Sequence, residues 1–247
     1  MASTRFLILA AIASLCFATA WSLPTAPILG GEEAATGAYK FVASIRSDGA
    51  HICGGSIIDS ITILTAAHCV AEAPVNGLSV RVGSTNQFAG GKIHYVDNVK
   101  IHPEYTKYVN DIAILTLSTE LVWSEKIAAI ELATSTADEP PVDAVVDVAG
   151  WGQQSTAASA YKLQHTTFTV ATEDVCLDAY SGKDDSNLCL AHPLKSGSCN
   201  GDAGNGGVYQ KKLVAVSNFV IGACGSRYPD VFANVAHHIA WINEARA

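Results

Sequence analysis

The sequence predicts an all-β protein that ends in a single helix. Short segments rich in β-branched residues recur along the chain, and Gly, Asn, Asp, Ser or Pro separate them. Those separators form turns easily, and many short strands of this kind are typical of a barrel or a sandwich. Helical patterns do not alternate with the strands, so a parallel sheet built from βαβ units is not expected.

The predicted elements are spread through most of the chain. The segments with strand composition are residues 41–46, 61–65, 78–82, 112–117, 144–148, 163–170 and 213–220. The segment with helical spacing is 235–245, where Ile239, Trp241 and Ile242 can share one face. Neither a repeat nor a long linker divides the sequence, so we expect one compact unit or two halves that share a core.

Composition narrows the classes of partner. The 247 residues are 49% hydrophobic and 15% charged, which is ample apolar material for a core. The formal net charge of −8 argues against nucleic acid or an anionic membrane as the main partner.

The first residues have the pattern of a secretory signal peptide. Arg5 precedes an apolar run over residues 6–17, and Ala18-Thr19-Ala20 supplies the small residues that signal peptidase prefers. A bilayer span needs roughly 20 apolar residues, so this run is too short to cross a membrane. We expect a signal peptide over residues 1–20, or 1–22 with a later cleavage, and a secreted, extracellular protein. A buried N-terminal helix is the alternative.

The cysteine count agrees with export. One of the seven, Cys16, lies in the signal peptide, and an even number remains in the secreted part. Such a set suggests disulfides, but six cysteines allow 15 pairings and spacing does not choose among them. The six are Cys53, Cys69, Cys176, Cys189, Cys199 and Cys224.

Six local motifs occur in a fixed order. They are Ile28-Leu29-Gly30-Gly31, Cys53-Gly54-Gly55-Ser56, Thr65-Ala66-Ala67-His68-Cys69, Asp111-Ile112-Ala113, Gly150-Trp151-Gly152 and Cys199-Asn200-Gly201-Asp202. Together they resemble the trypsin/chymotrypsin family of serine proteases (peptidase S1), and the resemblance covers residues 28–247. It implies a chymotrypsin-like fold, with two six-stranded antiparallel β-barrels, a cleft between them and a C-terminal α-helix.

The resemblance also implies a domain organisation and a disulfide pairing. Residues 21–27 become a short propeptide, and residues 28–247 form the peptidase S1-like domain. A set of three disulfides is more typical of invertebrate members, and the loop around Phe219 resembles that of secreted insect members. The implied pairs are Cys53–Cys69, Cys176–Cys189 and Cys199–Cys224.

The catalytic residues of the family are only partly present. By resemblance, His68 matches the general base and Asp111 matches the carboxylate that orients it. The family motif Gly-Asp-Ser-Gly-Gly-Pro reads Gly201-Asp202-Ala203-Gly204-Asn205-Gly206 here, so Ala203 stands in place of the nucleophilic serine. A methyl group has neither a proton to give up nor a lone pair, so an acyl-enzyme cannot form. We therefore predict a non-catalytic protease homologue, a pseudoprotease.

Two origins of Ala203 remain open. Asn205 and Gly206 also replace the usual Gly and Pro, which favours natural loss of the nucleophile over a designed change. The alternative is a secreted serine endopeptidase of non-tryptic specificity whose nucleophile is mutated in this chain. Two further alternatives are residual hydrolysis by a water that His68 activates, and antimicrobial or glycan binding, which the acidic charge balance disfavours.

The activation signal departs from the family pattern as well. The family implies a pair between a new amino terminus at Ile28 and the Asp202 carboxylate. Pro27 precedes Ile28, so a trypsin-like activator has no Arg or Lys to recognise. We expect a zymogen-like chain or trimming by a non-tryptic peptidase. The family's oxyanion hole uses backbone N–H groups, here those of Gly201 and Ala203, which the loss of a hydroxyl does not remove.

The predicted specificity pocket is not of the tryptic type. By resemblance its base is Gly197, which argues against a preference for Arg or Lys. Asp230 matches another pocket position and would bring an off-centre negative charge, with a solvated turn residue as the alternative. Ser217 is followed by Asn218 and Phe219 where the family usually has Trp-Gly, so we expect a narrowed pocket.

We expect no metal and no cofactor. His237 and His238 are interpreted as a surface pair on the terminal helix, and the loop 84–92, which binds calcium in some relatives, has no acidic residue. The expected partners are proteins or peptides, namely a protease, an inhibitor or a substrate, with neither nucleic acid nor membrane, and the chain is expected to be a monomer.

Overall fold

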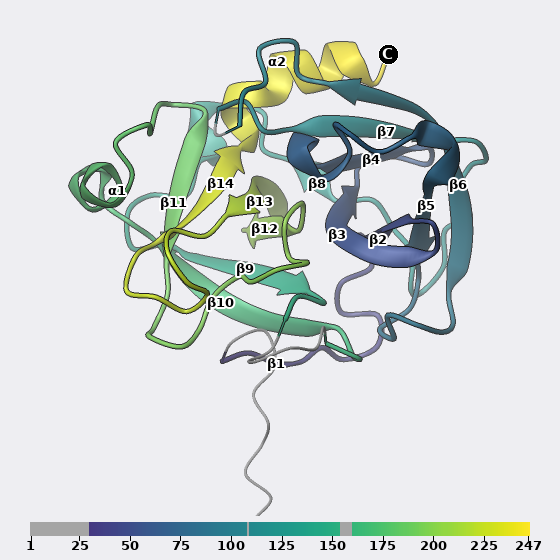
Figure 1. Ribbon diagram of the computed structural model, residues 1–247, viewed down its shortest axis with the longest axis horizontal. Coiled ribbons are helices and arrows are strands. Elements are labelled where there is room, and N and C mark those ends of the chain that lie inside the picture. The colour runs from purple at the N-terminus through teal and green to yellow at the C-terminus, as the bar shows by residue number, and fades with distance from the viewer. Residues whose placement is uncertain (1–29, 108, 154–159) are drawn as a thin grey trace, which may run out of the picture.

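The computed structural model describes residues 30–107, 109–153 and 160–247. The predicted signal peptide, the propeptide and Ile28 lie outside these ranges and stay predictions. Two closed antiparallel barrels lie side by side, and the C-terminal helix α2 (Val235–Ala245) crosses one end of the molecule (Figure 1). The predicted fold class is confirmed.

The first barrel closes in the order β2-β3-β4-β7-β6-β5. Its interior is apolar because Ile45, Leu64 and Ile114, from three of its strands, are completely buried. Burying such side chains is the main favourable contribution to folding, at about 1.5–3 kcal/mol each. Its strands are β2 (Val42–Ser47), β3 (Ala50–Ile57), β4 (Thr62–Thr65), β5 (Leu78–Val82), β6 (Lys92–Ile101) and β7 (Ala113–Leu117).

The second barrel closes because β9 pairs with both β10 and β12. Phe168 and Phe232 fill its core and meet edge to face at 5.6 Å between ring centroids. Two short strands extend it, β1 (Glu32–Glu33) on β10 and β8 (Glu131–Leu132) parallel to β13. Its own strands are β9 (Val145–Gly150), β10 (Gln164–Val170), β11 (Asn187–Ala191), β12 (Gly206–Tyr209), β13 (Lys212–Phe219) and β14 (Asp230–Asn234).

The predicted terminal helix has its predicted bounds. The side chain of Asn234 caps it by accepting from the N–H groups of Ala236 and His237. The expected surface histidine pair is half wrong, because His237 is exposed whereas His238 is 2% exposed. The imidazole of His238 packs inward, with Nδ1 at 2.7 Å from the carbonyl oxygen of Asn234.

The remaining helices are short. The helix α1 (Glu173–Ala179) has Thr172 as its N-cap, and single 3₁₀ turns lie at η1 (Ala67–Cys69), η2 (Val75–Gly77) and η3 (Thr136–Asp138). In the part of the chain that the structure describes, the helices are all too short or too polar to span a bilayer.

The six cysteines pair as the resemblance implies. The disulfides are Cys53–Cys69, Cys176–Cys189 and Cys199–Cys224. Cys53–Cys69 joins β3 to η1 in the first barrel, Cys176–Cys189 joins α1 to β11, and Cys199–Cys224 joins the loop before β12 to the loop between β13 and β14.

Candidate active-site cleft

A cavity of about 720 Å³ receives side chains from both barrels. The first barrel contributes His68 and Ile52, and the second contributes Ala203, Ser217 and Phe219. Residues more than a hundred positions apart in the sequence therefore share one surface, as expected for the cleft of a two-barrel protein.

Strand pairing brings His68 and Asp111 together. Thr65, the last residue of β4, pairs with Ala113, the first residue of β7, so the turn after β4 lies beside the loop before β7. The Asp111 carboxylate lies 2.7 Å from His68 Nδ1 and also accepts from the His68 backbone N–H at 2.8 Å. Asp111 is 1% exposed, whereas the His68 side chain is 38% exposed and faces the cavity. A carboxylate at Nδ1 keeps the proton on that nitrogen, so Nε2 carries a free lone pair, as a general base requires.

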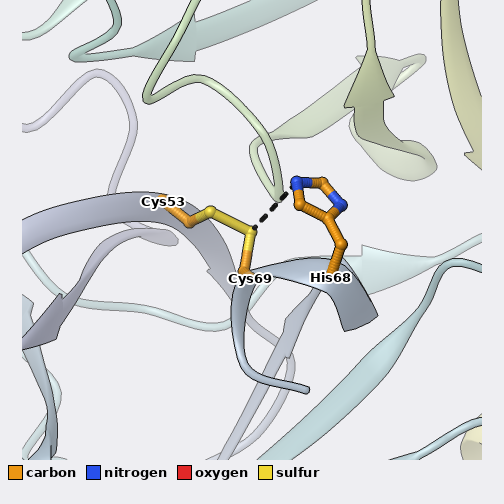
Figure 2. Close-up of side chains that lie close together, drawn as sticks. All are labelled: Cys53, His68 and Cys69. Atoms are coloured by element: carbon orange, nitrogen blue, oxygen red, sulfur yellow. Dashed lines mark hydrogen bonds between the residues drawn. A yellow bond between two sulfur atoms is a disulfide. The ribbon is translucent and has the colours of Figure 1, made fainter. Parts of the chain in front are cut away.

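His68 also lies next to the Cys53–Cys69 disulfide. Figure 2 shows its ring turned toward Cys69, with Nε2 at 3.8 Å from Sγ. The possible ligand atoms of these three residues lie within 4.8 Å of one another. Zinc is bound by thiolates, however, and both sulfurs are bonded to each other. While the disulfide is intact, this cluster does not provide a metal site.

Ala203 presents its methyl group to the same cavity as His68. Its backbone is held from both sides, since its carbonyl accepts from Gly54 N–H at 2.7 Å and Gly204 N–H donates to Ser217 at 2.6 Å. Gly201 has φ +94°, a conformation that favours glycine. Among the described residues, neither the Gly201 nor the Ala203 N–H is bonded to an acceptor. Both are therefore free to donate to a ligand.

Two further hydroxyls lie near this position. Ser198 and Ser217 both line the cavity, and each is less than 5% exposed. Ser198 Oγ is buried and has no partner within the described ranges. It is therefore an unsatisfied buried hydroxyl of a residue that lines the cavity.

Gly197 and Asp230, the residues of the predicted pocket base, lie beneath the residues that line the cavity. Asp230 is 2% exposed and accepts from Ser198 N–H at 2.7 Å, so the solvated-turn alternative is wrong. Its other oxygen lies 3.2 Å from His192 Nε2, and the two side chains are 3% and 0% exposed. A Cβ added to Gly197 would lie 2.7 Å from the His192 ring. The imidazole therefore closes the space beneath Gly197.

His192 was not predicted from the sequence. Burial lowers the pKa of its imidazole, but the hydrogen bond and the charge of Asp230 outweigh burial and raise the pKa above its ordinary value. The raised pKa favours the cationic form of His192, which would offset the negative charge expected from Asp230.

Phe219 and Asn218, for which we expect a narrowed pocket, both line the cavity. The Phe219 ring lines the cavity and meets Tyr180 edge to face at 5.3 Å, which anchors it toward the Cys176–Cys189 side. Asn218 is 3% exposed, and the amide orientation that satisfies its contacts donates to the carbonyl oxygens of Asp111 and Val216. It therefore connects the second barrel to the loop that carries Asp111.

A model of the trypsin family matches residues 28–242. The chain belongs to the trypsin family. Trypsin delta of Drosophila erecta is 34% identical to it over 223 residues, which cover 87% of each chain. Serine protease SP24D of Anopheles gambiae is 33% identical over 222 residues, which cover 88% of this chain and 80% of the relative. These insect relatives agree with the insect character expected from the sequence.

The fold of this trypsin-family chain also matches a solved structure. Neuropsin, a serine protease expressed in the limbic system of mouse brain, superposes with a TM-score of 0.82 over 89% of this chain and 100% of neuropsin. The two are 23% identical, so this likeness concerns the fold alone.

Asp202 is buried within the trypsin-family chain. Its carboxylate is 1% exposed and accepts from the backbone N–H groups of Gly152 at 2.8 Å and Cys199 at 3.0 Å. Burial raises its pKa to about 7, and these two hydrogen bonds offset burial only in part. Its expected partner, Ile28, lies outside the described residues, so that pair stays a prediction.

His51 is the second residue that the sequence did not single out. Its Nε2 lies 3.0 Å from the carbonyl oxygen of Gly201, and its Nδ1 lies 2.8 Å from the Ser44 hydroxyl. Burial lowers the pKa of His51 to about 4, so the ring is neutral and can donate to Gly201 while it accepts from Ser44. A first-barrel side chain thereby positions the backbone of Gly201.

Proposed function

We propose that this trypsin-family chain is secreted, binds peptides or proteins in the cleft without cleaving them, and acts as a decoy, cofactor or regulator of proteolysis. The observation that carries the proposal is the pairing of His68 with Asp111 opposite Ala203. Nδ1 lies against the carboxylate and the His68 side chain lines the cavity, but Ala203 offers only a methyl group, which has no proton for a general base to remove.

The backbone around Ala203 supports binding without cleavage. The N–H groups of Gly201 and Ala203 can donate to a peptide carbonyl, because this needs only backbone atoms. In another protease with the same triad logic, loss of the serine costs about 10⁶-fold in turnover, roughly 8 kcal/mol of barrier. Peptide affinity does not depend on a covalent step, so binding can persist after turnover is lost.

The pocket favours a neutral anchor side chain. Gly197 brings no charge, and Asp230 is paired with His192. Ser198 Oγ lacks a protein partner in the described part of the chain, so it can bond a polar group that enters from the cleft. We therefore propose that a neutral peptide side chain is preferred over Arg or Lys.

The second candidate function is a non-tryptic serine endopeptidase whose nucleophile is replaced in this chain. The intact His68–Asp111 geometry favours it, as do relatives that are named trypsins. Asn205 and Gly206 count against it, because a designed change would leave the neighbours of the serine unaltered.

The test compares the natural chain with Ala203→Ser on a mixed peptide library, with the double variant Ala203→Ser/His68→Ala as control. Peptide binding to the natural chain is measured in parallel by fluorescence anisotropy. We expect a silent natural chain that binds neutral peptides, and turnover in Ala203→Ser that depends on His68. Cleavage by the natural chain would refute the proposal, and silence together with absence of binding would move the function to the outer surface.

A further inference from the structure

Asn205 occupies an unusual place for an amide side chain. It is 0% exposed and lies between Gly54 of the first barrel and Gly150 of the second, where a Cβ on either glycine would collide with its amide group. The side chain is therefore wedged between the barrels behind the cleft. The two glycines leave the space that it fills.

The amide nitrogen of Asn205 has a definite partner. Nδ2 donates to Asp202 Oδ1 at 3.1 Å, and the Asp202 carboxylate thus has three N–H donors, the other two being Gly152 and Cys199. Asn205 Oδ1 is buried with no donor among the described residues. A buried unpaired oxygen is unfavourable, so what stabilises this side chain is its packing and the bond from Nδ2 to the carboxylate.

The same residue is tied to the loop that forms the cleft floor. Its backbone N–H donates to the Asp202 carbonyl at 3.1 Å, and its carbonyl accepts from Ser217 N–H at 2.8 Å. With the Asp202 N–H bond to the Cys199 carbonyl at 2.9 Å, these contacts close a compact turn around Gly201 and Ala203. Holding the Asp202 carboxylate therefore also holds the two free N–H groups that face the cleft.

Burying a carboxylate is unfavourable unless it accepts hydrogen bonds, and the donors can belong to any segment of the chain. An amino terminus at Ile28 could supply one only after the bond to Pro27 is cut. Asn205 supplies one from a position three residues along the chain, and it is present before any cleavage.

We propose that Asn205 is a positioning residue that holds Asp202, and with it the Gly201–Ala203 backbone, in the binding arrangement whether or not the chain is cut before Ile28. The binding cleft is then formed constitutively. This inference rests on the proposed function in that it takes the cleft to be the part of the molecule that binds.

The experiment compares two forms of the protein, one that begins at Trp21 and one that begins at Ile28. Residue-resolved hydrogen exchange follows the backbone amides of Asp202, Gly204 and Asn205, each of which donates a hydrogen bond within this turn or to β13. We expect exchange rates that agree within threefold between the two forms. A rate at least thirtyfold faster in the uncut form would overturn the proposal.

Two variants at Asn205 sharpen the test. Asn205→Gly restores the residue usual in the family, so the fold accommodates it, and Asn205→Leu keeps a side chain of similar size but removes the donor. In both, we expect exchange in the uncut form to become at least thirtyfold faster than in the form that begins at Ile28. Equal rates in the two forms of both variants would show that Asn205 has no such role.

A matched control separates positioning from general destabilisation. Val214→Ala truncates a buried side chain of β13 in the same barrel, away from Asp202. It should lower the melting temperature while exchange in the Asp202 turn stays equal in the two forms. Exchange reports on the backbone and not on a partner, so a formed turn with no peptide binding would refute the proposed function and leave the role of Asn205 standing.

Discussion

The two barrels contribute to the cleft in different ways. The first barrel presents His68 with its Nδ1 at 2.7 Å from a buried Asp111, the arrangement that a general base needs. The second presents Ala203, at the position where the sequence analysis predicts that a nucleophile is lost. Behind it lies Asn205, wedged against Asp202, and below the cavity lies His192, which is paired with Asp230.

The difference concerns how the polar side chains of each barrel are held in place. His68 and Asp111 touch each other through contacts that the sequence motifs imply, whereas the second-barrel residues have buried polar partners of their own. The side chains of Asn205 and His192 are almost fully buried, and each is hydrogen-bonded to a buried carboxylate, although Asn205 Oδ1 has no donor among the described residues. The cleft thus combines a His–Asp pair in the first barrel with buried polar pairs in the second, and variants in each half can test this division.

The largest expected effect concerns the first barrel. In an Ala203→Ser background, Asp111→Asn should lower kcat by about 10⁴-fold, because an amide at this position favours the wrong imidazole tautomer. Single-turnover hydrolysis of a neutral peptide measures it. A loss below tenfold would mean that the first-barrel pair is not poised for base catalysis.

The second expected effect concerns the floor of the second barrel. His192→Ala leaves the buried Asp230 carboxylate without its cationic partner, and removing one member of a buried pair costs about 3–5 kcal/mol. Urea unfolding of the natural chain and the variant measures the difference in the free energy of unfolding. A loss under about 1 kcal/mol would show that the pair is not sealed from water.

His51 in the first barrel and Asp202 in the second should change the free energy of unfolding with pH in opposite directions. The folded-state pKa of His51 is about 4, below the ordinary value of 6.5, so its stabilisation is present above pH 6.5 and is lost as pH falls toward 4. The folded-state pKa of Asp202 is about 7, above the ordinary value of 3.8, so its stabilisation is present below pH 3.8 and is lost as pH rises toward 7. Each group contributes a slope of at most about 1.4 kcal/mol per pH unit.

Unfolding free energies between pH 4 and 7 check this opposition. His51→Gln should make the stability of the chain fall more steeply with rising pH, and Asp202→Asn should make it rise more steeply. If the slope of unfolding free energy against pH changes in the same direction in both variants, His51 and Asp202 do not have the opposite effects assigned to them. A form that begins at Ile28 provides the control. If its terminal amino group pairs with the Asp202 carboxylate, the pH dependence that Asp202 contributes to the free energy of unfolding should disappear.

The smallest effect is expected at the surface. Lys162 and Glu33 form an ion pair at 2.8 Å, with side chains 41% and 58% exposed. Exposed pairs contribute roughly 0–1 kcal/mol, so Lys162→Ala should change the free energy of unfolding by no more than that. This variant is the matched control for His192→Ala in the same urea experiment. A loss as large as at His192 would mean that burial does not explain the difference between the two pairs.

Much of the fold could be predicted from local patterns. The seven predicted strands and the terminal helix are present, most within one or two residues of their predicted bounds. Seven strands have no counterpart among the predicted segments, namely β1, β3, β6, β8, β11, β12 and β14. Of these, β3 contains adjacent glycines, and β6 mixes polar and charged residues with most of its side chains exposed. The helix α1 was missed because it is only seven residues long.

The candidate site likewise contains residues that local motifs predict and residues that only the tertiary structure places there. His68, Asp111 and Ala203 were predicted as site residues because each lies in a short motif of contiguous residues. His51 contacts Gly201 across a sequence separation of 150, and His192 contacts Asp230 across 38. Neither contact leaves a mark on the neighbouring sequence.

The sequence by itself determined the all-β class, the order of the main strands, the acidic charge and the absence of a hydroxyl at position 203. These properties depend on residue identity and on preferences that act over a few neighbours. The tertiary structure alone decided that Asp230 pairs with His192, that His51 supports Gly201 and that Asn205 bonds Asp202. The physical reason is that a buried polar group takes its partner from whatever chain segment packs against it, and the packing of two barrels sets those neighbours.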